Sequence, residues 1–181
     1  MEIMKKLLLA IVFVITAPVM AADHTVEMLS SSNGEMMVFK PAVLKISPGD
    51  TVTWKATNPG HNTASIAEMT PDSSLVWNGK INEELKITFN KEGVYGYKCT
   101  PHYILGMVGI IAVGNDLTNL SASSDFATSE EKKFATNKER FSSYINQLKW
   151  LMTQTDEYFL ESKPLFSGKI REVYNFSDDK I

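Results

Sequence analysis

The only cysteine of this chain lies in a short segment whose other side chains also bind soft metal ions. Cys99, His102 and Met107 fall within nine residues, and Pro101 and Gly106 mark the segment as a turn. Thiolate, imidazole and thioether are donors that suit copper. Two imidazoles and a thiolate in a trigonal array, with a long axial methionine, form a copper site for electron transfer. The segment therefore predicts three of the four ligands of such a site.

The second imidazole must come from elsewhere in the chain, which contains three histidines. His24 lies beside the predicted mature amino terminus, so His61 is the better candidate. His61 precedes Cys99 by 38 residues and follows the strand-like run 51–57 through a turn of Asn, Pro and Gly. Both ligand segments are therefore expected at the ends of strands, where a packed scaffold can hold them.

Short segments rich in β-forming residues surround both candidate ligand segments. They predict strands at 25–29, 36–40, 42–46, 51–57, 85–89, 93–97 and 108–113. A polar turn is expected at 30–35. A tight turn is expected at 47–50, since Pro48 presets φ and Gly49 accepts positive φ. Several short strands with turns between them indicate an all-β sandwich or barrel, and about 90 residues can enclose one core.

Three motifs carry a resemblance to a known family. They are Gly60-His61-Asn62, the Cys99-x2-His102-x4-Met107 loop that begins Cys-Thr-Pro-His-Tyr, and the Pro48-Gly49-Asp50-Thr51-Val52 turn. With these motifs the chain resembles the cupredoxins, and most closely the pseudoazurins, over roughly residues 26–148.

The resemblance implies a cupredoxin-like Greek-key β-sandwich with a C-terminal α-helical extension. It implies one type 1 copper per chain, with His61, Cys99, His102 and Met107 as the metal ligands. It also implies that Asn62 ties the His61 segment to the Cys99 loop, with Thr100 as its partner. The expected function is that of a blue-copper electron carrier that cycles between Cu(II) and Cu(I) and is not an enzyme.

The resemblance also implies redox partner proteins, such as copper nitrite reductase or a c-type cytochrome. Such carriers dock through lysines around an apolar patch, which here would include Pro59, Pro101, Ile104 and Met37 near the ring of His102. Yet the segment 23–114 carries 7 Lys or Arg against 9 Asp or Glu. We therefore expect a weaker basic docking ring and a monomeric protein.

The first 21 residues have the pattern of a secretory signal. Lys5 and Lys6 precede a short apolar run, and Val19-Met20-Ala21 forms a cleavage site of small residues. The run is too short for an ordinary membrane-spanning helix, which needs about 20 apolar residues. We expect a mature periplasmic protein that starts near Ala22 and has no membrane anchor after cleavage.

The C-terminal third differs in character from the predicted sandwich of residues 22–116. Residues 116–127 suggest a polar loop, and Thr128 to Glu131 resemble a capping box. A helix is expected from about 129 to 152, interrupted near Asn137, within a helical segment 117–152 packed on the sandwich. Its apolar stripe consists of Phe134, Phe141, Ile145, Leu148 and Met152. The stripe alone equally allows a helix that binds a partner protein. Residues 153–181 receive no role.

The sequence also bears on three other classes of function. A cysteine nucleophile needs only one base, whereas this chain supplies two histidines and a methionine. A net charge of −3 without a basic stripe gives no support to nucleic-acid binding. A copper carrier or storage protein, or a structural zinc site, stays open as the alternative, because Zn²⁺ accepts Cys and His ligands too.

Overall fold

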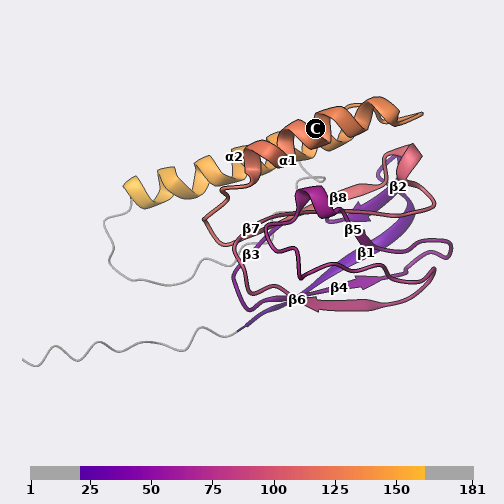
Figure 1. Ribbon diagram of the computed structural model, residues 1–181, viewed down its shortest axis with the longest axis horizontal. Helices are drawn as coiled ribbons and strands as arrows, with labels where there is room; N and C mark the ends of the chain where they lie inside the picture. The colour runs from indigo at the N-terminus through magenta and orange to yellow at the C-terminus, as the bar shows by residue number, and fades with distance from the viewer. Residues whose placement is uncertain (1–20, 162–181) are drawn as a thin grey trace, which may run out of the picture.

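The computed structural model describes residues 21–161, with side chains described through residue 154. Eight strands form two four-stranded sheets, and two α-helices follow them (Figure 1). The first sheet has the order β2-β1-β4-β6, made of β1 (Asp23–Ser32), β2 (Glu35–Lys40), β4 (Thr51–Lys55) and β6 (Leu85–Thr88). The second has the order β3-β8-β7-β5, made of β3 (Val43–Ile46), β5 (Ala64–Ser65), β7 (Gly93–Lys98) and β8 (Val108–Val113).

The predicted two-sheet architecture is confirmed, and its sheets are mixed. β1 pairs parallel with β4 and antiparallel with β2, while β3 pairs parallel with β8. β1 extends further than expected, through residues that had suggested a turn at 30–35. The actual turn is limited to Asn33 and Gly34, both of which have positive φ. The polar residues before the turn continue the strand because they pair with β2.

The core of the sandwich lies between the sheets and is rich in aromatic rings. Trp54 contacts Tyr97, Trp77 and Phe89 with ring centroids 5.2, 5.3 and 6.3 Å apart. Cys99 belongs to the same buried cluster. The cysteine that the sequence singles out therefore lies in the buried apolar core of the sandwich.

The second sheet is covered on both faces, which explains why every residue of β8 is buried. Ile111 and Val113 face the sandwich core, whereas Val108, Ile110 and Ala112 belong to a second cluster. That second cluster is completed by side chains of the helical region, which lies over this sheet (Figure 1). A strand in a sheet that is buried on both faces has apolar side chains at every position, and the continuous apolar sequence of β8 fits this pattern.

The helical region differs in its limits from the expectation. The structure has α1 (Leu120–Glu130), the 3₁₀ turn η3 (Glu131–Lys133) and α2 (Arg140–Glu161) instead of one helix from 129 to 152. The prediction of a polar loop at 116–127 was therefore largely wrong. The prediction of a capping box at 128–131 was also wrong, because these residues lie within α1 and η3. The serine-rich sequence of α1 has little apolar periodicity, so its helix is formed by packing on the sheet and on α2.

Other expectations for the C-terminal third agree with the structure. Asn137 interrupts the helices with φ of 53°, and four residues of the predicted stripe are buried, namely Phe134, Phe141, Ile145 and Leu148. α2 continues to Glu161, into the segment that received no role. The predicted signal sequence, except Ala21, and residues 162–181 lie outside the described part of the chain.

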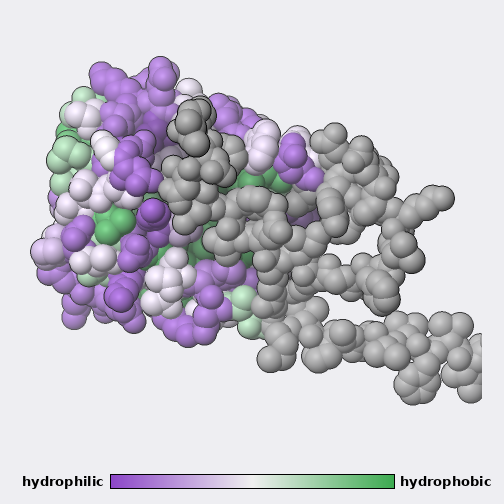
Figure 2. Space-filling model, turned by 180° about the vertical axis from the view of Figure 1, so that it is seen from behind, coloured by the Kyte–Doolittle hydropathy of each residue, from purple (hydrophilic) through white to green (hydrophobic). Residues whose placement is uncertain are grey.

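The surface is mainly polar on the face that Figure 2 shows, with separate hydrophobic patches between hydrophilic residues. None of the described helices combines the length and the hydrophobicity that crossing a membrane requires.

The turn before β4 is tied to the start of β1 by a buried carboxylate. Asp50 is 3% exposed and accepts hydrogen bonds from the backbone nitrogens of Ala22 and Ser47, at 2.7 and 2.9 Å. The Nε2 atom of His24 lies 3.2 Å from the second carboxylate oxygen. Burial alone would raise the pKa of Asp50, but these hydrogen bonds and His24 outweigh it and hold the pKa below its usual value.

Replacing Asp50 by Asn should lower the free energy of unfolding at neutral pH by about 2 kcal/mol, because hydrogen bonds to a charged acceptor are lost. The folded pKa lies below the unfolded value of about 4, so this stabilisation is present above that pH. It disappears as the pH falls through the folded pKa, and the two proteins should then converge. Urea denaturation at neutral and acid pH measures both effects.

The matched control is Asp23→Asn, which removes an exposed carboxylate that pairs with Lys86 on the surface. It should leave the free energy of unfolding nearly unchanged. An Asp50→Asn variant as stable as this control at neutral pH would show that the buried carboxylate does not hold the two segments together.

Candidate metal centre

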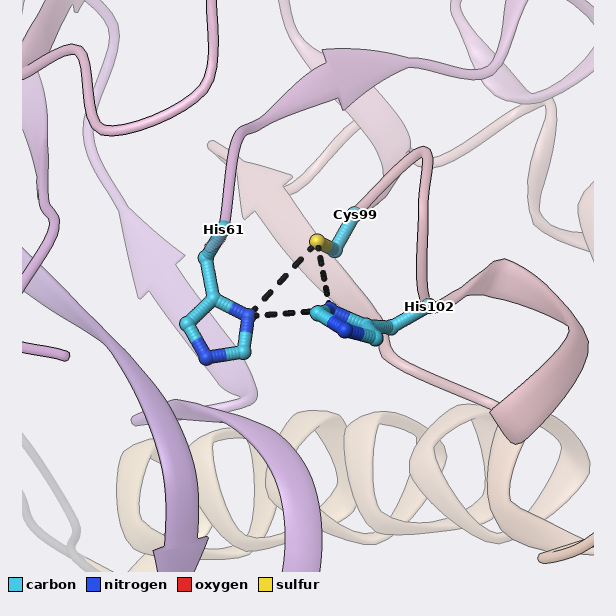
Figure 3. Close-up of side chains that lie close together, drawn as sticks. All are labelled: His61, Cys99 and His102. Atoms are coloured by element: carbon cyan, nitrogen blue, oxygen red, sulfur yellow. Dashed lines mark hydrogen bonds between the residues drawn. The ribbon is translucent and has the colours of Figure 1, made fainter. Parts of the chain in front are cut away.

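Three of the four predicted ligand residues converge on one point between the sheets. The Sγ atom of Cys99 lies 3.7 Å from Nδ1 of His61 and 3.4 Å from Nδ1 of His102 (Figure 3). The two Nδ1 atoms are 3.1 Å apart. Among the residues that the structure describes, this is the group of histidine, cysteine and acidic side chains placed to hold a metal ion.

The triangle formed by these donor atoms fits a metal ion. A point at its centre lies about 2 Å from each donor, the usual length of a bond from a first-row metal to nitrogen or sulfur. Three atoms with lone pairs repel one another at this separation unless a cation or shared protons lie between them. The donor set is soft to borderline, which suits copper.

The segment after β7 positions Cys99 and His102 through its own backbone. The amide of Cys99 donates to the carbonyl of Met107 over 3.0 Å, and that of Met107 donates to the carbonyl of His102 over 3.2 Å. The amide of His102 donates back to the carbonyl of Cys99, also over 3.2 Å. Each of the three residues is therefore fixed to another, and the short 3₁₀ turn η2 (Tyr103–Leu105) lies within the loop they close.

Met107 is the fourth predicted ligand, and its side chain is fully buried in the same cluster as Cys99. Ligation by its sulfur stays a prediction. His24 was the less favoured ligand candidate in the sequence analysis. It pairs with Asp50 in the turn before β4 and is not part of the group around Cys99.

Asn62 links the two ligand segments, as the resemblance implied. Its Oδ1 accepts from the backbone nitrogen of Thr100 at 2.7 Å, and its Nδ2 donates to the hydroxyl of Thr100 at 3.2 Å. The same amide group donates to the carbonyl of Gly79 at 2.9 Å. Because Asn62 is 4% exposed, water cannot easily replace these bonds.

Ser30 is a site residue that sequence reasoning missed. Its hydroxyl lies 3.2 Å from Nε2 of His61, on the side of the ring opposite the three converging donors, and so fixes the orientation of the imidazole. The backbone nitrogen of Ser30 in turn donates to the side chain of Asn58 at 2.9 Å. A serine in a polar run carries no sequence signal for this role, since the contact depends on how β1 lies beside the His61 segment.

Burial governs the acid–base properties of the site. It raises the pKa of the Cys99 thiol, although nearby backbone N–H groups of Asn62 and His102 lower it in part. It lowers the pKa of His61, and the closeness of His102 lowers it further. His61 is therefore neutral at neutral pH, the form that binds metals, while the Cys99 thiol must release its proton when a metal binds.

The two histidines differ in their access to the surface. His61 is 1% exposed, whereas His102 is half-buried and reaches the surface beside exposed side chains of its own loop, Pro101 and Ile104. Met37, expected in the surface patch, is only partly exposed and packs against the cluster that contains Cys99. His102 is therefore the member of the group that connects the site to the surface.

Comparison with known proteins agrees with this geometry. Residues 26–114 match the copper-binding proteins of the plastocyanin/azurin family. Pseudoazurin from Methylorubrum extorquens is 43% identical over 114 residues, which cover 63% of this chain and 77% of that protein. Pseudoazurin from Paracoccus pantotrophus is 40% identical over 113 residues, which cover 62% of this chain and 78% of that protein. The crystal structure of native pseudoazurin from Hyphomicrobium denitrificans aligns with a TM-score of 0.62 at 32% identity, over 69% of this chain and 97% of that one.

The two-sheet fold and the His-Cys-His group define a copper-binding protein of the cupredoxin class. Within that class, the chain belongs to the pseudoazurin family. Copper is accordingly the metal for which the group of His61, Cys99 and His102 is arranged.

Asn62→Ala should lower the free energy of unfolding by about 2–3 kcal/mol, because the variant loses three hydrogen bonds at a buried position. It should also bind copper more weakly, since the two ligand segments are no longer joined. Denaturation of the metal-free protein and competition with a copper chelator measure the two effects. Thr100→Val is the matched control: it removes only the hydroxyl contact, so its effects should be less than half as large. Equal effects would contradict the bridging role of Asn62.

Proposed function

We propose that this protein is an electron carrier with a blue-copper site, in which His61, Cys99, His102 and Met107 would hold the metal. The observation that carries the proposal is the convergence of two Nδ1 atoms and one Sγ atom within 3.7 Å of one another between two packed sheets. When bound, copper supplies one-electron chemistry by alternating between Cu(II) and Cu(I).

The protein's part is to keep the ligands in nearly one arrangement in both oxidation states. Cys99 and Met107 are fully buried, and His61 nearly so, which excludes water from the interior of the site. The backbone bonds of the Cys99 loop and the Asn62–Thr100 link resist movement when the charge of the site changes. Small rearrangement means a small barrier to electron transfer, and His102 provides the short path to the surface.

The alternative of a carrier or storage protein for copper is less well supported. Exchange of metal favours exposed ligands that rearrange easily, and these side chains lie at strand ends, mostly in the core. A structural zinc site would also accept this group, but a buried methionine at the fourth position suits copper better than zinc. The related cupredoxins are electron carriers rather than enzymes.

Several finer points extend the proposal. The signal-like residues 1–21 support a periplasmic location, and the family supports a redox partner such as copper nitrite reductase or a c-type cytochrome. We infer that a monomer docks through the surface around His102, where Ile104 in the same loop is 58% exposed. Lys98, one of few cations there, stacks over the ring of Tyr103 at 4.6 Å.

The ligand roles are tested by two substitutions. Cys99→Ser should abolish the intense visible absorption that arises from charge transfer between the thiolate and Cu(II), even if metal still binds. Met107→Gln should keep that absorption but lower the reduction potential, because the axial donor tunes it. Visible spectra and redox titration measure both. An unchanged spectrum in the first variant, or an unchanged potential in the second, would contradict the corresponding role.

The docking proposal is tested by the rate of electron transfer to a purified copper nitrite reductase. Ile104→Ala should slow the bimolecular reaction by about tenfold, since hydrophobic anchors dominate such interfaces. Val76→Ala is the matched control, as Val76 is similarly exposed at 60% but lies in the connection before β6. Because the basic ring is weak, the rate should change little with salt. A steep fall with salt, or equal rates for the two variants, would contradict this surface.

A further inference from the structure

Arg140, the first residue of α2, has a guanidinium group that is buried beside the Cys99 loop. The residue is 7% exposed. Its Nη1 atom lies within hydrogen-bond distance of three backbone carbonyls, those of Met36, Met37 and Gly106, at 3.1, 2.9 and 3.1 Å. These carbonyls belong to β2 and to the loop before β8, so one side chain joins the helical region to two parts of the sandwich.

The environment of Arg140 is unusual for a buried cation. Among the described residues no carboxylate forms a salt bridge with it, and its Nη2 atom has no hydrogen-bond partner. Burial of a charge without a counter-ion is costly. The contacts that offset this cost are the dipoles of the three carbonyls, and those carbonyls lie beside the candidate copper site.

Two of the three carbonyls belong to residues with a left-handed backbone. Met37 has φ of 54°, which is rare for a bulky side chain, and it interrupts the pairing of β1 with β2 between Met36 and Val38. Its side chain packs against the cluster that contains Cys99 and Met107. Arg140 therefore holds a strained backbone whose side chain lies against the candidate copper site.

The other carbonyl belongs to Gly106, which has φ of 77° and immediately precedes Met107. The two carbonyls before it are held by the same C-terminal segment. The carbonyl of Leu105 accepts from the Asn137 side chain at 2.8 Å, and that of Ile104 accepts from the backbone of residue 135 at 2.7 Å. The segment 135–140 thus fixes three consecutive carbonyls of the loop that ends in Met107.

We propose that Arg140 is a positioning residue of the copper site, through which α2 sets the backbone of Met37 and of the 104–107 loop. The inference rests on the proposed function and adds two roles. The contact with Gly106 determines how Met107 approaches the metal position. The buried positive charge also disfavours Cu(II) relative to Cu(I), and so raises the reduction potential.

The positional role can be measured without metal. In Arg140→Met, the amides of Cys99 and Met107, which close the loop, should exchange with deuterium about tenfold faster or more, because a charged hydrogen bond that held the loop is lost. Lys138→Met is the matched control, since it removes one exposed cation two residues away. Its exchange should equal that of the unaltered protein.

The copper form separates geometry from charge. Arg140→Met should lower the reduction potential and change the ratio of the two thiolate-to-copper bands, which reports the axial contact. Arg140→Lys keeps the charge on a shorter side chain that cannot place its nitrogen where Nη1 lies, so it should retain the potential while the band ratio still changes. Asn137→Gly keeps the left-handed backbone and removes only the amide contact, so it should alter the band ratio without a loss of charge.

Arg140→Met with unchanged exchange, potential and band ratio would overturn the proposal. If that variant does not fold, unchanged band ratios in both Arg140→Lys and Asn137→Gly would overturn it instead. Failure of the proposed function can be distinguished from failure of this inference. In that case the unaltered protein would lack the thiolate-to-copper bands, while amide exchange would still report whether Arg140 holds the loop.

Discussion

The structure depends on holding two imidazole nitrogens and one sulfur within 3.1–3.7 Å of one another in the core. Hydrogen bonds among these few atoms cannot by themselves fix three side chains from two separate segments, so the elements around them must keep them in place. The scaffold does so from three sides. The Cys99 loop closes on itself, Asn62 joins it to the His61 segment, and Ser30 fixes the far side of the His61 ring.

The helical region packs against the sheet that carries the Cys99 loop and so supports this arrangement. β7 and β8, which flank the Cys99 loop, are covered on one face by the aromatic core and on the other by α1 and α2. A sheet buried on both faces has little freedom to bend. Arg140 then extends the support from the sheet to the loop itself, through the carbonyl of Gly106. The helices are thus a structural part of the site as well as a cover for the sheet.

The features that could be predicted from sequence are those with a local signature. The spacing of Cys99, His102 and Met107 identified the loop, and Pro48 with Gly49 identified the turn before β4. The features that could not be predicted depend on contacts between distant segments. α1 lacks apolar periodicity and forms through packing. Arg140 looks like a solvent-exposed residue at the start of a polar helix, and only the approach of β2 and the loop reveals it as buried.

The central claim is that the buried donors form a redox-active thiolate–copper site. Its most direct test is to add one equivalent of Cu(II) to the metal-free protein and record the visible spectrum before and after ascorbate. The account requires an intense band in the red that bleaches on reduction. A weak or absent band, together with tight binding of Zn²⁺, would contradict it and would favour a structural or transport site.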